Sequence, residues 1–226
     1  GRAAASCCSS SASEEATVKQ GLCDIIVVMD RSGSMSTIQK DMEGGFDQFI
    51  KEQRALPGEC RVSLFQFDDR YEAVYLRRPV NEVKPCRLEP RSLTALLDAV
   101  GRTINGVGAE FASDREEERP EKVVFIIITD GQENASREFT LQQVKGLIEC
   151  QQKNFNWQFV YLGSDPSTFT DAAGLGVKGV MFTHDSRGTA RAYTDTAKAV
   201  CDYRSGTTST LSVPQDEAAL PPTPKP

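Results

Sequence analysis

The sequence contains almost no histidine, and this limits the chemistry that the protein can perform. The single residue, His184, lies in the polar segment FTHDSRG, just after a short apolar stretch. A Ser-His-Asp or Cys-His site would depend on it, and the chain has no GxSxG nucleophile elbow. We therefore expect His184 to be a loop residue and predict no catalytic residues.

Basic charge and long apolar runs are scarce as well. The chain has 26 Lys and Arg against 32 Asp and Glu, which gives a formal net charge of −6. Because no basic field can attract phosphate backbones, neither nucleic acid nor an anionic membrane surface is expected as a partner. No apolar run approaches the ~18 residues of a membrane span, and no signal peptide is recognisable. The sequence therefore predicts a cytoplasmic protein.

The seven cysteines form no CxxC pair, which excludes a zinc ribbon and a thioredoxin-like motif. Scattered cysteines in odd number are typical of reduced thiols in a reducing compartment. Cys23, Cys60, Cys150 and Cys201 lie within or beside apolar periodic segments. We expect these four to be small core residues.

The chain of 226 residues is long enough for one α/β domain. Residues 1–20 are rich in Ser and Ala and 205–226 in Ser, Thr and Pro, so both are predicted to be disordered tails. Between them, residues 21–204 alternate between apolar strands and segments with helical spacing. This alternation predicts a doubly wound, mostly parallel sheet with helices on both faces.

Turn and cap signals refine this prediction. Asp68-Asp69 separates two alternating segments and predicts a hairpin whose second strand, residues 71–80, is an antiparallel edge strand. Ser36 with Gln39, and Thr140 with Gln143, match capping boxes at the starts of two helices.

Two strongly apolar strands end on aspartates, Asp30 and Asp130. If these strands are neighbours in a parallel sheet, the two carboxylates lie at the same edge, where open α/β sheets place their sites. Ser32 and Ser34 alternate along the turn after Asp30, so their hydroxyls face the same point. An all-oxygen group with few carboxylates favours Mg²⁺ or Mn²⁺ over Zn²⁺. Helix capping is the simpler alternative for DRSGS taken alone.

Three segments together resemble the von Willebrand factor type A domain. DRSGSM resembles its DxSxS element, IIITDG resembles its later strand-end aspartate, and SLTALLDAVG supplies the third element, a threonine, at Thr94. The resemblance extends from Leu22 to about Tyr203. Ala95 stands where the family usually has proline, and Ser92-Leu93 replaces a lead-in that contains glycine.

The resemblance implies a metal-ion-dependent adhesion site and a Rossmann-like fold. By this likeness, Ser32 and Ser34 ligate the metal directly, Thr94 binds directly or through water, and Asp30 and Asp130 act mostly through water. The metal then accepts an Asp or Glu carboxylate from a protein partner. We therefore expect a metal-dependent protein-binding module, an intracellular adaptor or assembly factor without catalysis of its own.

Two alternatives remain open at this point. A phosphohydrolase of the haloacid dehalogenase type also places an aspartate after its first strand, but it needs a second aspartate where this chain has Ser32. A structural domain with a vestigial site is the other alternative.

Further polar residues could assist a cation or face a partner. Asp68, Asp69 and Asp114 fit exposed turn positions most simply, and Glu133 and Asn134 follow Asp130 in a segment that could form the rim of the site.

Overall fold

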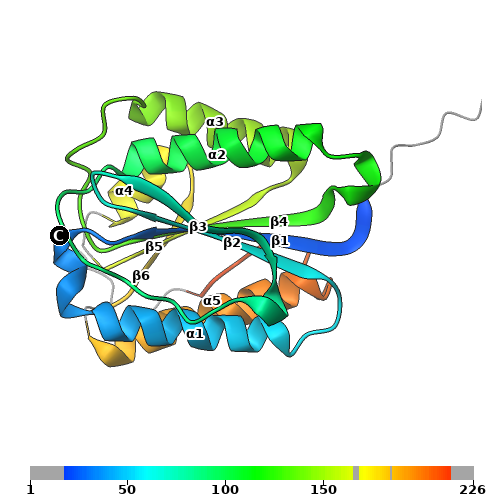
Figure 1. Ribbon diagram of the computed structural model, residues 1–226, viewed down its shortest axis with the longest axis horizontal. Coiled ribbons are helices and arrows are strands. Elements are labelled where there is room, and N and C mark those ends of the chain that lie inside the picture. The colour runs from blue at the N-terminus through cyan, green and yellow to red at the C-terminus, as the bar shows by residue number, and fades with distance from the viewer. Residues whose placement is uncertain (1–17, 165–167, 184, 215–226) are drawn as a thin grey trace, which may run out of the picture.

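A six-stranded sheet organises the protein, with strands in the order β3-β2-β1-β4-β5-β6 (Figure 1). The computed structural model describes residues 18–164, 168–183 and 185–214. The strands are β1 (Lys19–Asp30), β2 (Cys60–Phe67), β3 (Tyr71–Pro79), β4 (Pro120–Thr129), β5 (Gln158–Gly163) and β6 (Lys178–Met181). All neighbouring strands are parallel except β2 and β3, which confirms the predicted hairpin and its antiparallel edge strand.

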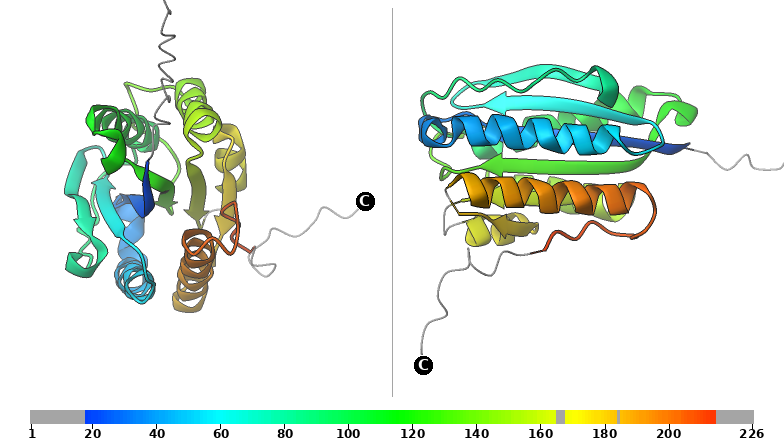
Figure 2. Two further views of the ribbon diagram at one scale, coloured as in Figure 1. Left: turned by 90° about the vertical axis from the view of Figure 1, so that its right-hand side faces the viewer. Right: turned by 90° about the horizontal axis from the view of Figure 1, so that it is seen from below.

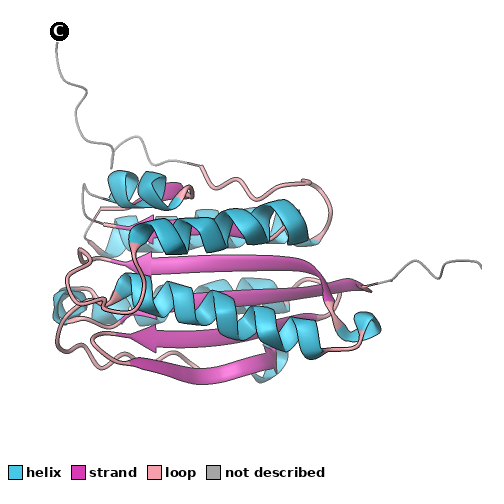
Figure 3. Ribbon diagram, turned by 90° about the horizontal axis from the view of Figure 1, so that it is seen from above, coloured by secondary structure: helices cyan, strands magenta, loops and turns pink. Residues whose placement is uncertain are grey.

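Helices cover both faces of the sheet, as predicted. They are α1 (Gln39–Arg54), α2 (Leu96–Ser113), α3 (Leu141–Phe155), α4 (Thr168–Leu175) and α5 (Ser186–Arg204). Helices α1 and α5 lie on one face, seen from below in Figure 2, and α2, α3 and α4 lie on the other, seen from above in Figure 3.

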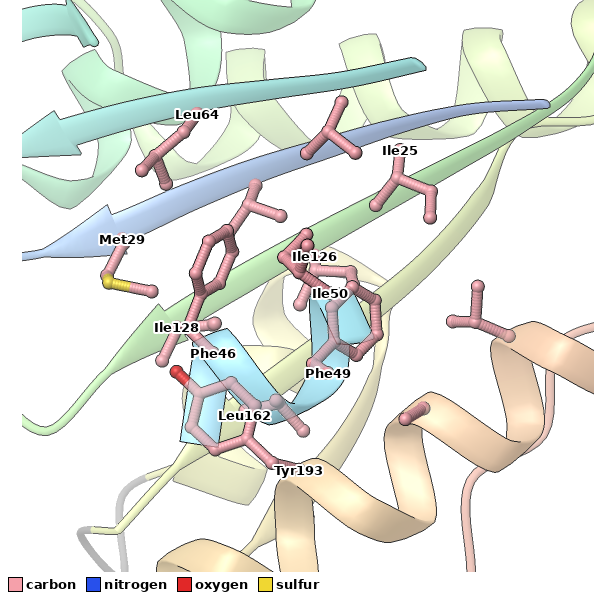
Figure 4. Packing of buried hydrophobic residues seen from close by; sticks show 14 of the residues in the cluster. Ile25, Met29, Phe46, Phe49, Ile50, Leu64, Ile126, Ile128, Leu162 and Tyr193 are labelled. Atoms are coloured by element: carbon pink, nitrogen blue, oxygen red, sulfur yellow. The ribbon is translucent and has the colours of Figure 1, made fainter. Parts of the chain in front are cut away.

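Strand β1 is buried on both faces because its apolar run alternates between two cores. Ile25 and Met29 pack toward α1 and α5, where Phe46 and Phe49 contribute aromatic rings (Figure 4). Ile26 and Val28 pack toward α2 and α3 on the opposite face. Each such side chain stabilises the fold by roughly 1.5–3 kcal/mol relative to an exposed position. Burial on both faces explains why β1 reads as a continuous apolar run.

Strands β1 and β4 are direct neighbours, and Met29 is paired in register with Ile128. Asp30 therefore ends β1 and Asp130 directly follows β4, at the carboxyl ends of adjacent parallel strands, as the sequence predicted. The strand order reverses here, with β2 and β3 on one side of β1 and β4 to β6 on the other. Such a switch point is where open α/β sheets carry their binding sites.

The two predicted capping boxes have different outcomes. Thr140 and Gln143 form a reciprocal capping box at the start of α3, which is confirmed. The prediction at Ser36 is wrong, because residues Gly33–Thr37 form a short 3₁₀ helix, η1, and Ile38 is the N-cap of α1 without a side-chain cap. The tighter 3₁₀ turn carries the chain from the strand end into the helix, so Ser36 is not at the helix boundary.

Several remaining predictions concern the ends of the domain and the cysteines. Helix α5 ends at Arg204, and the chain continues in irregular structure to residue 214, where Val213 is buried against the core. Cys23 and Cys60 are buried as predicted, but Cys201 is only partly buried and Cys150, on α3, is exposed. No helix in the described ranges is long and apolar enough to cross a membrane. His184, predicted to be a loop residue, lies outside the described residues.

Candidate metal centre

Asp30 ends β1 with a carboxylate that is completely buried and accepts hydrogen bonds only from uncharged groups. Its Oδ1 accepts the Ser32 N–H at 2.6 Å, and its Oδ2 accepts the Thr129 hydroxyl at 2.6 Å. Burial raises the pKa of Asp30 to about 6, although these hydrogen bonds oppose the shift; the charge of nearby Asp130 adds to it. None of the described Lys or Arg side chains pairs with Asp30.

Ser32, Ser34 and Asp130 form a continuous chain of oxygen atoms in front of Asp30. The two serine Oγ atoms are 3.0 Å apart, and the Ser34 hydroxyl donates to Asp130 Oδ1 at 2.6 Å. Ser32 is buried and Ser34 is exposed. This row of hydrogen-bonded oxygen atoms therefore runs from the protein interior to its surface.

The hydroxyl of Thr94 joins this group, as the position of Gly131 shows. A Cβ placed on Gly131 would lie 3.0 Å from Thr94 Oγ1, 3.3 Å from Ser34 Oγ and 3.4 Å from Ser32 Oγ. Three hydroxyls thus converge on a space that only glycine leaves open. The structure therefore brings all five predicted site residues together at the sheet edge.

This donor set fits a small, hard cation. Hydroxyl and carboxylate oxygens are the ligands that Mg²⁺ and Mn²⁺ prefer, and neighbouring ligands of an octahedral ion with ~2.1 Å bonds lie about 3 Å apart. The two serine Oγ atoms, which are hydrogen-bonded to each other at 3.0 Å, are already close enough to contact one such ion. Three or more His, Cys, Asp or Glu side chains do not gather as a metal cluster anywhere in the described ranges. A site here would depend on hydroxyl ligands and only two carboxylates.

The segment after Asp130 holds Thr94 and the start of α2. Asn134 Oδ1 accepts the Thr94 N–H at 2.9 Å, and the Asn134 N–H donates to the Thr94 carbonyl at 3.0 Å. Glu133 accepts a hydrogen bond from the Leu97 N–H at 2.9 Å. Leu97 is in the first turn of α2, where backbone N–H groups have no acceptor within the helix. The side chains of Glu133 and Asn134 thus form hydrogen bonds within the chain, and Asn134 is also exposed; the partner-facing role stays a prediction.

Asp68 departs from its predicted position in an exposed turn. Its side chain is 0% exposed and accepts hydrogen bonds from Arg31 and Arg91. Burial raises the pKa of Asp68, but the hydrogen bonds from Arg91 and from the Arg70 N–H outweigh this, so the pKa lies below its ordinary value. Asp114 is paired with Arg77. The exposed-turn prediction is correct only for Asp69.

Sequence reasoning missed the contacts that support the site. Thr129 immediately precedes Asp130 and faces Asp30 across the β1–β4 pair. Knowledge of the strand register would have revealed this contact. Met29 pairs with Ile128, so the next residues, Asp30 and Thr129, lie side by side. Asn134 and Asp68 were named from the sequence, but their supporting contacts were not predicted, because their partners are distant in sequence.

Comparisons with known proteins identify the fold. Neither the family models nor the curated proteins give a match. Solved structures do match: proximal thread matrix protein 1 from the mussel byssus has a TM-score of 0.56 at 16% identity, over 83% of this chain and 47% of that one. A von Willebrand factor type A protein from Catenulispora acidiphila has a TM-score of 0.54 at 16% identity, over 82% and 43%.

A third structure, the ArnB paralog VWA2 from Sulfolobus acidocaldarius, matches at a TM-score of 0.51 and 14% identity, over 80% of this chain and 46% of that one. The chain thus spans less than half of each of these proteins. At such identities the likeness defines the fold alone: the chain has a von Willebrand factor type A-like fold, a Rossmann-like α/β architecture. Such a fold hosts many roles, so function has to be argued from the site.

Proposed function

We propose that this domain is a metal-dependent protein-binding module with a metal-ion-dependent adhesion site of the von Willebrand factor type A kind. The observation that carries the proposal is the arrangement around Asp30: a buried carboxylate with no basic partner among the described residues lies behind three converging hydroxyls. A buried carboxylate is costly unless its charge is compensated, and a bound cation would supply that compensation.

Each site residue has a defined part in this proposal. The hydroxyls of Ser32, Ser34 and Thr94 are the neutral ligands, and Asp30 and Asp130 contribute charge from behind and beside them. Bound there, Mg²⁺ or Mn²⁺ would offer a coordination position to an Asp or Glu carboxylate of a protein partner. Neutral ligands leave the positive charge of a cation largely unquenched, which favours an incoming carboxylate.

The proposal assigns the protein to a reducing compartment, as an adaptor or assembly factor inside the cell. All five cysteines within the described ranges are free, and three of them, Cys23, Cys60 and Cys86, are buried. Free buried thiols are typical of proteins that reside where glutathione and thioredoxin keep cysteines reduced.

A calorimetric Mn²⁺ titration tests the metal site. The wild type should show saturable binding, and Ser34→Ala and Asp130→Asn should each weaken it by about ten-fold or more. Ser36→Ala is the matched control, because Ser36 is an exposed hydroxyl of the same loop outside the converging group. Absence of saturable binding in the wild type would favour a structural domain with a vestigial site.

The carboxylate-binding role needs a separate measurement. Acetate, as a model carboxylate, should lower the water-proton relaxation enhancement of the Mn²⁺-loaded protein by replacing a bound water. Capture of a partner should then require Mg²⁺ and be lost with EDTA. Turnover of an aryl phosphate that depends on Mg²⁺ and Asp30 would instead support the phosphohydrolase alternative, although Ser32 stands where that class needs its general acid.

A further inference from the structure

Asp68 is a buried carboxylate at the turn between β2 and β3 that joins the two loops carrying the site hydroxyls. Its Oδ2 accepts Arg31 Nε at 3.0 Å and Arg91 Nε at 2.7 Å. Arg31 stands between Asp30 and Ser32, and Arg91 lies three residues before Thr94. One carboxylate oxygen therefore holds a side chain from each loop.

Backbone hydrogen bonds extend this connection. The Asp68 carbonyl accepts the Ala95 N–H at 2.9 Å, directly after Thr94, and the Arg91 N–H donates to the Arg31 carbonyl at 2.9 Å. The two loops also meet where the Gly33 N–H donates to the Ser92 carbonyl at 3.2 Å. The relative position of the two loops is thus fixed around Asp68.

The loop before Thr94 needs such external support. Ser92 has a φ of +60°, in the left-handed region, where a residue other than glycine is disfavoured by about 1 kcal/mol or more. Such a conformation persists when surrounding contacts impose it. The hydrogen bonds to Asp68 and from Gly33 are among the contacts that hold this loop.

Asp68 should matter more for holding Arg31 than Glu72, the exposed second partner of that arginine. Arg31 has a side-chain exposure of only 6%, and its second partner, Glu72, is 58% exposed at 2.7 Å. Removal of Asp68 would leave the guanidinium groups of Arg31 and Arg91 without their shared buried carboxylate, whereas removal of Glu72 would leave that carboxylate in place. Loss of a buried partner is far more disruptive than loss of an exposed one.

We propose that Asp68 is a positioning residue of the metal centre: it holds the Ser32–Ser34 loop against the Thr94 loop, so that hydroxyls from both reach one cation. This inference rests on the proposed function, since Asp68 would position the ligands of that same metal site. Asp68 itself takes no part as a ligand.

The test compares Mn²⁺ affinities of wild type and variants by calorimetry. Asp68→Asn should weaken binding about ten-fold or more, and Arg91→Gln, which removes one connection and keeps Arg31 paired, should weaken it several-fold. Glu72→Gln, which removes the exposed partner of the same Arg31, should leave the affinity unchanged. Ile104→Val, a buried change on α2 away from the site, lowers stability and should also leave the affinity unchanged, so loss of stability alone cannot account for weaker binding.

The outcomes separate this inference from the proposed function. A wild type without saturable Mn²⁺ binding overturns both. A wild type that binds, with Asp68→Asn and Arg91→Gln binding equally well, overturns the positioning role alone. If Asp68→Asn does not fold, Arg91→Gln decides. Hydrogen exchange without metal gives an independent readout: the Asp68→Asn and Arg91→Gln proteins should exchange faster in both loops, and unchanged exchange in the Ser32–Ser34 loop contradicts the connection.

Discussion

Strand β1 buries two aspartates in two different environments. Asp24, in the middle of the strand, is held by Arg61 through two hydrogen bonds of 2.6 and 2.7 Å. Asp30, at the carboxyl end, accepts hydrogen bonds from uncharged groups, the Thr129 hydroxyl and the N–H and side chain of Ser32. Burial raises the pKa of both, but at Asp24 the arginine opposes the shift, whereas at Asp30 only neutral donors do. The carboxylate of Asp24 therefore has a basic partner within the chain, whereas that of Asp30 has none among the described residues.

The largest expected effect belongs to Asp24. Asp24→Asn should lower the free energy of unfolding by roughly 3 kcal/mol, because it leaves the partly buried Arg61 without its carboxylate. Urea unfolding measures this change. The Mn²⁺ affinity of the folded variant should equal that of the wild type; a weaker affinity would show that the two regions are not independent.

Asp30→Asn, in contrast, should raise the free energy of unfolding at neutral pH in the metal-free protein. The pKa of Asp30 is about 6 when folded and lower when unfolded, so between about pH 4 and 6 the native state binds more protons, and the contribution of Asp30 to stability falls as pH rises. The variant should therefore gain on the wild type, by up to roughly 3 kcal/mol between about pH 4 and pH 7.

Urea unfolding of the wild type and Asp30→Asn in EDTA at several pH values measures this difference in stability. Asp24 is present in both proteins, so its contribution cancels. Mn²⁺ at neutral pH should then stabilise the wild type and not Asp30→Asn. A stability difference between the two proteins that does not vary with pH would contradict the assigned environment of Asp30.

Gly131→Ala should weaken Mn²⁺ binding by about ten-fold, or about 1.4 kcal/mol, with a smaller effect on folding. The added methyl would lie 3.0 Å from Thr94 Oγ1 and crowd the two serine hydroxyls. Gly44→Ala, on the exposed side of α1 where a Cβ meets nothing within 4 Å, is the matched control for calorimetry. Equal affinity of the two variants would show that the hydroxyls do not act around this space.

The sequence predicted the part of the site that depends on strand order. Apolar runs ending at Asp30 and Asp130 predicted that both carboxylates meet at one edge if their strands are neighbours. Short-range spacing added Ser32 and Ser34, and the family resemblance added Thr94. What it did not predict depends on contacts distant in sequence. Asp68 and Asp69 look identical in a turn, yet Asp68 is buried because Arg31 and Arg91, from two other segments, reach it.

Local patterns also failed where the chain used an unexpected turn. Ser36 and Gln39 have the spacing of a capping box, but the chain forms a 3₁₀ turn over Gly33–Thr37 first, so the helix boundary moves past Ser36. Thr140 and Gln143 have the same spacing and do cap α3, because an irregular segment precedes them. The pattern alone does not distinguish the two cases.

The smallest expected effect tests how firmly Thr94 must be held. Asn134→Ala removes the side-chain acceptor of the Thr94 N–H but keeps the backbone bond from residue 134 to the Thr94 carbonyl. We expect a loss of about 1 kcal/mol or less in the free energy of unfolding and a few-fold loss of Mn²⁺ affinity. Gln132→Ala, at an exposed position of the same loop, should change neither. If Asn134→Ala binds Mn²⁺ like the wild type, the backbone bonds and the Asp68 contacts suffice to hold Thr94; if it loses binding as completely as Ser34→Ala, this side chain is as important as a ligand.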